Sequence, residues 1–314
     1  MPPPLTFARV PGVRLGHATT LDGASGVTVV RFDRARPVVV DVRGGASATY
    51  DIASLALDAT FGRRWAIFLS GGSLYGLDAA RGVRTRILEE GEGQPAFASP
   101  SRVVPIAGAA LFDLPVESAA IPDYLPLGYE ATRVAGRSAA ASGHVGAGAG
   151  ATVGKYLGRS RAMRGGLASA AVRIARGGTL GVLVVVNAVG AVRDPHNGAW
   201  IAGARARSGR ISPPRSGTAA EGTDSHTTLA IAVTDLAIGR PGLQRIAANV
   251  SAGLARVIVP FHTSVDGDLV FAASTEQRTT LPRERRAGEL VDRIGVRAAE
   301  LASEVAARAV RPSA

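Results

Sequence analysis

At Thr227 the chain changes abruptly from a polar stretch to an apolar one. Between Pro195 and His226 the sequence is rich in Gly, Ser and Arg and contains Pro213 and Pro214, whereas "TTLAIAVTDLAI", which follows at once, is apolar and β-branched. Residues of the first kind favour loops, and residues of the second kind favour buried strands. The pattern therefore predicts a long loop that ends directly at a strand. Loops of more than about 15 residues are usually functional or mobile, although this one could also be a plain linker between domains.

Changes from polar or Gly-rich segments to apolar, β-branched runs recur along the chain and indicate its fold class. Short β-branched runs bounded by Gly or Pro predict strands, among them "GVTVVRF", "PVVVDVRGG" and "SRVVPIAGAALFDL". Farther on, "GGLASAAVRIARGGTLGVLVVVN" predicts two strands joined at Gly177-Gly178, the second ending near Asn187. "VIVPFHTSVDGDLVFAAST" predicts a strand, a turn and another strand. Helical segments lie between these runs, so the expected fold class is α+β.

Apolar spacing predicts three helices. The first covers "SLYGLDAARGVRTRILEEG" and ends at Gly91, the second covers "GLQRIAANVSAGLARVI", and the third runs from residue 289 to residue 308. The expected buried faces of the second and third helices are Leu243, Ile246, Ala247, Val250, Leu254 and Val257, and Leu290, Ile294, Leu301 and Val305. We expect the terminal helix to pack on its own sheet rather than on a partner.

Length and composition bound the architecture. With 314 residues, 46% of them hydrophobic, the chain can bury a large core. We see no internal repeat and no second complete core, which predicts a single domain over residues 1–314. The absence of cysteine excludes disulfides and thiolate metal sites and fits the cytoplasm. The longest apolar run, "LGVLVVVNAVGAV", is too short to cross a bilayer and the N-terminus has no signal-like pattern, so we expect a soluble cytoplasmic protein.

The excess of basic over acidic residues does not predict nucleic-acid binding. The 36 Lys and Arg exceed the 25 Asp and Glu and give a formal charge of +11, but the arginines are scattered and aromatic residues make up only 5%. Lys155 is the only lysine among the 36 basic residues. Because lysine is a compact ammonium that arginine does not replace, a lone lysine suggests a site that requires it, although chance could also leave one.

Two apparent motifs fail on spacing, and a third stays open. "GAGAGATVGKY" lacks the phosphate-loop pattern, because Ala149 and Tyr156 stand where Gly and Ser or Thr are required, and close backbone packing explains its glycines better. The five histidines form no HExxH pair, so no metal or cofactor is expected. Asp266 and Asp268 are two residues apart in "SVDGDLVF", which suits either a pair of interacting carboxylates or an ordinary Asp-Gly-Asp turn.

Ten motifs in order carry a resemblance to a known family. The chain resembles the DmpA-type L-aminopeptidase/D-esterase family, which includes β-aminopeptidases and the nylon oligomer hydrolase. The motifs cover nearly the whole chain: "GVRLGHATT", "GVTVV", "VDVRGGASATYD", "LSGGSLYGLDAARGV", "VPIAGAALFDLP", "GHVGAGAGATVGKYLG", "GGLASAAVRI", "VVNAVGAVRDP", "HTTLAIAVTDLA" and "HTSVDGDLVFAAST". This resemblance implies an αββα sandwich whose precursor cuts itself before a Ser or Thr, which then becomes the nucleophile.

The same resemblance implies particular site residues. The nucleophile falls on Thr227 and the cut falls between His226 and Thr227, which gives fragments 1–226 and 227–314. The supporting residues implied by the motifs are Lys155, Asn187, Asp266 and Asp268. A threonine with two aspartates and a lysine is similar to the nylon oligomer hydrolase branch, whereas the aminopeptidase branch tends to use Ser with Ser and Glu. His226 stands where the nylon oligomer hydrolase branch has Asn, and Phe112 stands where relatives can carry Tyr.

The expected mechanism follows from these residues. An N-terminal threonine carries its own base, since its α-amine has a pKa of roughly 8. Asn187 is expected to hold the oxyanion through its amide NH2. Asp266 is expected to orient the threonine and its amine, and Asp268 to orient Asp266, while Lys155 keeps both carboxylates ionised.

Three functions are consistent with the sequence. The first is hydrolysis of linear amides such as 6-aminohexanoate oligomers or small peptides by a homotetramer of cleaved protomers, an assembly that the resemblance implies. The second is an aminopeptidase that releases N-terminal β-, D- or small L-residues. The third is an unprocessed, non-catalytic protein whose basic surface binds an anion or nucleic acid. We favour the first, which needs no cofactor, nucleic acid or membrane.

Overall fold

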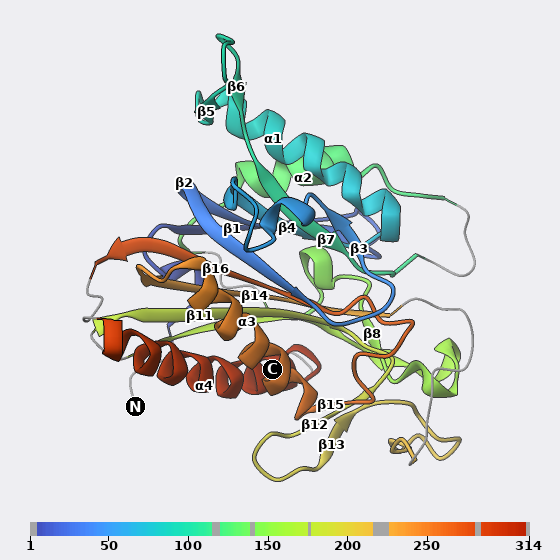
Figure 1. Cartoon of the computed structure of the whole chain (residues 1–314). Coiled ribbons are helices and arrows are strands. Elements are labelled where there is room, and N and C mark those ends of the chain that lie inside the picture. Colours follow the sequence, from blue (N-terminus) through green and yellow to red (C-terminus); the bar gives the residue numbers. More distant parts are fainter. Residues whose placement is uncertain are drawn as a thin grey trace.

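The computed structural model of the chain describes residues 5–114, 120–138, 142–174, 177–215, 226–279 and 284–311, with the backbone alone for residues 284–287. A short strand at Trp200–Ala202 interrupts the predicted long loop, and the last part of that loop, residues 216–225, lies outside the described residues. Helices lie on both outer sides of the molecule with strands between them (Figure 1). The α-helices are α1 (Ala79–Glu89), α2 (Tyr124–Arg133), α3 (Arg240–Ala255) and α4 (Glu284–Ala309).

One long series of paired strands forms the inner layers. Its strands are paired in the order β10-β11-β14-β16-β2-β4-β7-β3, with β1 paired to β2. Their bounds are β1 (Val13–Thr19), β2 (Gly26–Val42), β3 (Ala48–Tyr50), β4 (Arg63–Ser70), β7 (Ile106–Ala110), β10 (Gly166–Arg173), β11 (Thr179–Asn187), β14 (Thr227–Leu236) and β16 (Leu269–Arg278). The short strands elsewhere are β5 (Gln94–Pro95), β6 (Arg102–Val103), β8 (Thr152–Val153), β9 (Met163–Arg164), β12 (Ala191–Arg193), β13 (Trp200–Ala202) and β15 (Ile258–Val259).

Strand β2 joins the two halves of this series. Its first part pairs with β1 and β4, and its last part, from Val38 to Val42, pairs with β16. The register with β4 shifts between Arg31 and Arg36, and the pairing with β16 begins only after Pro37. The sequence predicted two separate strands here, because a polar segment divides the apolar runs. That prediction is wrong: Arg36 is buried, and its guanidinium donates to Asp33, so the chain stays extended.

Hydrophobic clusters separate four layers of structure. One cluster lies between the two sheet halves and contains Leu229, Ile231 and Val233 of β14. The alternate residues Ala230 and Ala232 belong to a second cluster, beneath α3 and α4. A third cluster packs β4 against α1 and α2. Because side chains alternate along a strand, β14 is buried on both faces, which explains its continuous apolar sequence. The predicted αββα sandwich is confirmed.

The three helices form where the apolar spacing predicts them, but their bounds differ: α3 ends at Ala255, before the predicted end at Ile258, and α4 starts at Glu284, before the predicted start at residue 289. All of the residues predicted to line the inner faces of the second and third helices are buried. The first predicted helix begins later than expected, because Ser73–Asp78 forms a 3₁₀ segment and α1 starts at Ala79.

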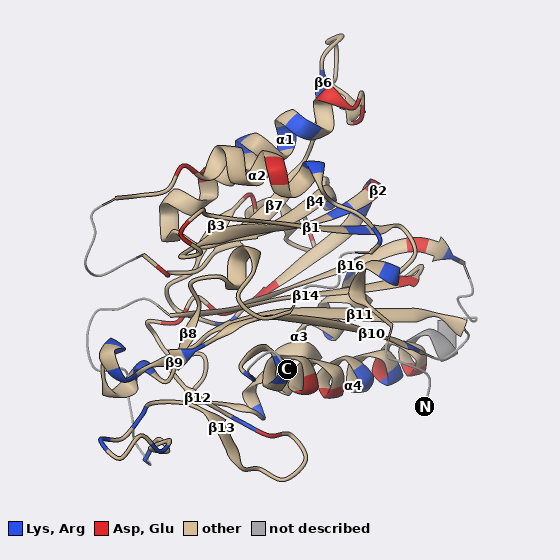
Figure 2. Ribbon diagram, turned by 180° about the vertical axis from the view of Figure 1, so that it is seen from behind, with Lys and Arg blue, Asp and Glu red and all other residues tan. Residues whose placement is uncertain are grey.

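Lys and Arg positions are distributed over helices, strands and loops (Figure 2). Within the described ranges, no helix is both long and apolar enough to cross a membrane.

Candidate active site

Thr227 and Asn187 face each other where two central strands meet an edge of the sheet. Thr227 is the first residue of β14, Asn187 is the last residue of β11, and the two are direct partners in the antiparallel register. Counting by twos from Leu229 and Val185 puts both side chains on the face between the sheet halves. Both are buried, Thr227 being 2% exposed. The predicted nucleophile and the predicted oxyanion donor are therefore neighbours.

The carbonyl group of His226 accepts two hydrogen bonds. The Thr227 hydroxyl donates to the His226 oxygen at 2.6 Å, and the backbone N–H of Gly267 donates to the same oxygen at 2.6 Å. The hydroxyl thus lies against the carbonyl that it would attack in a cut between residues 226 and 227. If it attacked, negative charge would develop on the oxygen that Gly267 already binds, as in an oxyanion hole. Sequence reasoning did not identify Gly267.

Asp266 has one carboxylate oxygen fixed and one unpaired. Its Oδ2 accepts from the backbone N–H of Thr263 at 2.8 Å and from the Thr263 hydroxyl at 2.6 Å. Its Oδ1 is buried and has no hydrogen-bond partner among the described residues. Burial, and then the charge of Asp268, raise the pKa of Asp266 to about 6, while the charge of Lys155 opposes the rise. Such a carboxylate can accept a proton near neutral pH.

Asp268 is held by groups other than Asp266. Its Oδ1 accepts from the Thr228 N–H at 2.6 Å, and its Oδ2 accepts from the His262 N–H at 3.0 Å and lies 3.1 Å from the His262 ring Nδ1. The ring's other nitrogen lies 2.8 Å from the Ser251 hydroxyl on α3. No hydrogen bond in the described structure joins the two carboxylates, so the direct orienting contact on Asp266 comes from Thr263. The only sequence signal for His262 was its place in "HTSVDGD".

Lys155 contacts Asn187 directly. Its buried Nζ donates to the Asn187 main-chain oxygen and to Asn187 Oδ1, both at 2.8 Å. The Thr152 N–H also donates to Asn187 Oδ1 at 3.0 Å, and Asn187 Nδ2 donates to the Phe112 oxygen at 3.0 Å. Since an amide nitrogen carries two hydrogens, the second remains for a substrate oxygen. Lys155 thus fixes Asn187 by contact and acts on Asp266 through its charge.

The residue before the predicted cut is a neutral histidine. His226 is buried, and burial, followed by the charges of Lys155 and Arg159, lowers its pKa to about 3. Its ring Nδ1 has no hydrogen-bond partner among the described residues. The ring therefore adds no positive charge beside the hydroxyl of Thr227. Within the described residues, no group of three or more His, Asp or Glu side chains could hold a metal ion.

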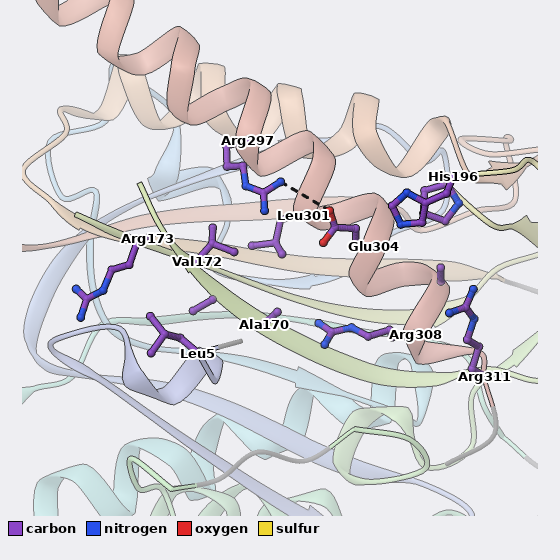
Figure 3. Close-up of a pocket in the computed structure, with 13 residues that line it drawn as sticks. Leu5, Ala170, Val172, Arg173, His196, Arg297, Leu301, Glu304, Arg308 and Arg311 are labelled. Atoms are coloured by element: carbon purple, nitrogen blue, oxygen red, sulfur yellow. Dashed lines mark ion pairs between the residues drawn. The ribbon is translucent and has the colours of Figure 1, made fainter. Parts of the chain in front are cut away.

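A cavity of about 540 Å³ between β10 and α4 is unrelated to this site (Figure 3). It is lined by apolar side chains and by Arg173, Arg297, Arg308 and Arg311, but by none of the predicted site residues. Its β10 residues pair with the far end of β11 from Asn187. The catalytic residues predicted from the sequence are therefore not located in this cavity.

Comparison with known proteins agrees with the fold. Residues 7–313 match the model of Peptidase family S58. The chain belongs to this family. It is therefore a hydrolase that acts on amide bonds, and the sequence-based family resemblance is confirmed.

Two kinds of relatives are similar in sequence. An "uncharacterized aminopeptidase" of Mycobacterium tuberculosis is 38% identical over 288 residues, which cover 85% of this chain and 80% of the relative. A "6-aminohexanoate-oligomer endohydrolase" of Kocuria sp. is 31% identical over 277 residues, which cover 85% of this chain and 74% of the relative. The two names correspond to the two hydrolase functions expected from the sequence.

Solved structures show the fold. The L-aminopeptidase D-Ala-esterase/amidase of Ochrobactrum anthropi, described as a variant of the Ntn hydrolase fold, superposes with a TM-score of 0.69 at 19% identity, over 97% of this chain and 85% of that one. The β-aminopeptidase of Burkholderia sp. gives a TM-score of 0.66 at 19% identity, over 98% of this chain and 87% of that one. The chain has the same fold.

Proposed function

We propose that this hydrolase cuts itself between His226 and Thr227 and then uses Thr227 as an N-terminal nucleophile. The observation that carries the proposal is the His226 carbonyl, which lies against the Thr227 hydroxyl and accepts the Gly267 N–H, each at 2.6 Å. The mature fragments would be residues 1–226 and 227–314.

The proposed self-cleavage uses the buried groups around the His226 carbonyl. Thr227 Oγ1 attacks the carbonyl carbon of His226, and Asp266 Oδ1 takes the hydroxyl proton. The Gly267 N–H stabilises the oxyanion that forms. The C–N bond then breaks, the proton passes to the nitrogen of Thr227, and an ester joins His226 to the threonine oxygen. Water hydrolyses this ester and leaves a carboxylate on His226 and a free amine and hydroxyl on Thr227.

The mature site reuses most of these groups on a substrate. The α-amine of Thr227 takes the proton of its own hydroxyl, whose oxygen attacks the substrate amide. The free hydrogen of Asn187 Nδ2 is available to the substrate oxyanion, a type of contact worth about 3 kcal/mol of barrier. Lys155 holds Asn187 in position and favours the ionised form of Asp266. The amine leaves with a proton, and water releases the acyl group.

The substrate we favour is a linear amide such as a 6-aminohexanoate oligomer. Support comes from the Thr, Asp, Asp and Lys set and from the 31% identity to the 6-aminohexanoate-oligomer endohydrolase. An aminopeptidase is the second candidate, supported by the 38% identity to a protein of that name. Comparison of 6-aminohexanoate oligomers with β-alanyl and D-alanyl amides as substrates distinguishes the two.

Electrophoresis and mass spectrometry of the purified protein test self-cleavage. We expect a fragment that ends at His226 and a fragment that begins at Thr227. Thr227→Ala should stay in one piece and lack amide hydrolysis, whereas Thr227→Ser, which keeps a hydroxyl, should still be cut. An intact wild-type chain with full activity would refute the proposal.

We also propose a homotetramer of cleaved protomers in the cytoplasm. The assembly rests on the family resemblance, and the location rests on the cysteine-free composition. Light scattering on the processed protein tests the first, against a protomer mass of 32.0 kDa, and cell fractionation tests the second.

A further inference from the structure

A second cavity, which we call the Asp113 cavity, lies beside the active site. Its volume is about 710 Å³, and it lies between residues 20–25 and the start of α2. Its walls are largely apolar, with Leu21, Ile121, Pro122 and Leu127 among them, and Asp113 contributes a carboxylate. The size and the apolar walls suit a flexible hydrocarbon chain.

The charged residues that the structure describes in the wall of the Asp113 cavity are all acidic. Asp22, Asp113 and Asp123 line it, and its described lining includes no Lys, Arg or His. This is unexpected in a chain with a formal charge of +11. A cavity lined by negative charges attracts a cation and disfavours a carboxylate.

Asp113 is a buried carboxylate with an unused oxygen. It is 6% exposed, and its Oδ1 accepts from the Gly72 N–H at 2.7 Å. Its Oδ2 is buried without a hydrogen-bond partner in the described part of the chain. Burial raises the pKa of Asp113 to about 6, and the neighbouring Ser25 hydroxyl and Gly72 N–H offset only part of that rise. A buried charge of this kind is stabilised by a cation.

Two glycines let the backbone close tightly around this carboxylate, and a third lets it close around Tyr124. A β-carbon on Gly71 would lie 2.1 Å from Asp113 Oδ2, and one on Gly150 would lie 2.7 Å from it. A β-carbon on Gly72 would lie 2.2 Å from the Tyr124 ring. The Tyr124 hydroxyl in turn lies 2.8 Å from the Ser25 hydroxyl. The position of the carboxylate is therefore set by close contacts on several sides.

The residues on either side of Asp113 are held by Asn187 of the active site and by Arg159. The preceding carbonyl, of Phe112, accepts from Asn187 Nδ2 at 3.0 Å, and the following carbonyl, of Leu114, accepts from Arg159 at 3.0 Å. Asn187 is the register partner of Thr227. The charge of Lys155 also acts on Asp113. The Asp113 cavity thus adjoins the groups that would handle the scissile amide.

We propose that Asp113 binds the primary ammonium at the far end of the acyl group of the substrate, whose methylene chain lies along the apolar wall. This inference rests on the proposed function and specifies its substrate class as ω-aminoacyl amides. The hydroxyls of Ser25 and Tyr124 are further acceptors for the ammonium hydrogens.

A matched pair of substrates tests the ammonium site. The 6-aminohexanoyl and hexanoyl p-nitroanilides have the same chain length and leaving group, but only the first carries an ammonium. With the wild-type protein we expect kcat/KM for the first to exceed that for the second on the order of 100-fold. In Asp113→Asn, which keeps the shape and removes the charge, the ratio should fall close to one. Equal ratios in the two proteins would overturn the inference.

Controls separate this inference from the proposed function. Asp292→Asn removes an exposed carboxylate on α4, 61% exposed, and should keep the wild-type ratio. Hydrolysis of both anilides at equal rates would leave the hydrolase in place and refute the ammonium site. If neither anilide is hydrolysed, calorimetry tests the ammonium site without turnover: hexylamine should bind the wild-type protein at least 10-fold more tightly than Asp113→Asn. Equal affinities would refute it.

Discussion

Replacement of Gly267 by alanine should slow self-cleavage without removing any predicted catalytic side chain. The Gly267 N–H donates to the oxygen of His226, and a β-carbon at this position would lie 2.6 Å from the Thr227 hydroxyl oxygen. Ordinary contact begins at 3.4 Å, so the two atoms must separate by about 0.8 Å. The chain at Ala46 and Ser47 lies 3.0 and 3.2 Å away, which limits movement in the other direction.

The size of the effect follows from this displacement. A misplacement of about 1 Å in a reacting group costs about 100-fold in rate, and the loss of one oxyanion donor costs about 100- to 1,000-fold. The two losses describe one disturbed contact, so we do not add them. We expect Gly267→Ala to be cut about 100-fold more slowly than the wild-type chain, a barrier increase of about 2.7 kcal/mol.

A time course on a denaturing gel measures this rate. The Gly267→Ala protein should be purified largely uncut, and the two fragments should appear slowly on incubation. Gly288→Ala is the matched control, because no atom lies within 4 Å of its added β-carbon. It should be cut at the wild-type rate. If Gly267→Ala, folded by circular dichroism, were cut as fast as this control, the position assigned to the attacking Thr227 hydroxyl beside Gly267 would be wrong.

Further predictions concern the charged groups and their partners. The self-cleavage rate should rise with pH through about 6, because Asp266 must be ionised to accept a proton; a rate independent of pH between about 5 and about 8 would contradict this. Lys155→Met should move that rise to higher pH, since the ammonium lowers the pKa of Asp266, and an unmoved profile would exclude the electrostatic role. Asn187→Ala should lower kcat about 100-fold with a smaller change in KM, as steady-state kinetics would measure. In a Thr227→Ala background, His262→Ala should lower the free energy of unfolding by about 1–3 kcal/mol in urea titration, because Asp268 loses a ring partner; an unchanged value would show that its backbone partners suffice.

Local sequence pattern was sufficient for most of the secondary structure. The helices α3 and α4 were predictable because their apolar residues repeat with the helical period, and β11 and β14 were predictable because both faces are apolar. The continuity of β2 was not predictable, because its polar middle resembles a turn. It stays extended through the burial of Arg36 beside Asp33, a contact that local pattern does not indicate.

The candidate site was only partly accessible to sequence reasoning. Family motifs selected the polar side chains, and the structure brings Lys155 onto Asn187 and Asn187 opposite Thr227. The contributions of Gly267 and Asp113 could not be found in this way. The first acts through its main-chain N–H, and the second gains its role from the approach of segments that lie far apart in the sequence.

The strand order has a consequence for the two pieces that the proposed cut between His226 and Thr227 would leave. Two adjacent strands of the C-terminal piece, β14 and β16, lie between β11 on one side and β2 on the other, and both of these outer strands belong to the N-terminal piece. Each piece therefore completes a sheet that the other interrupts. Separation would break main-chain ladders on two sides at once and expose the apolar interior, so the nicked protein should behave as an interlocked unit that gives up its halves only by unfolding.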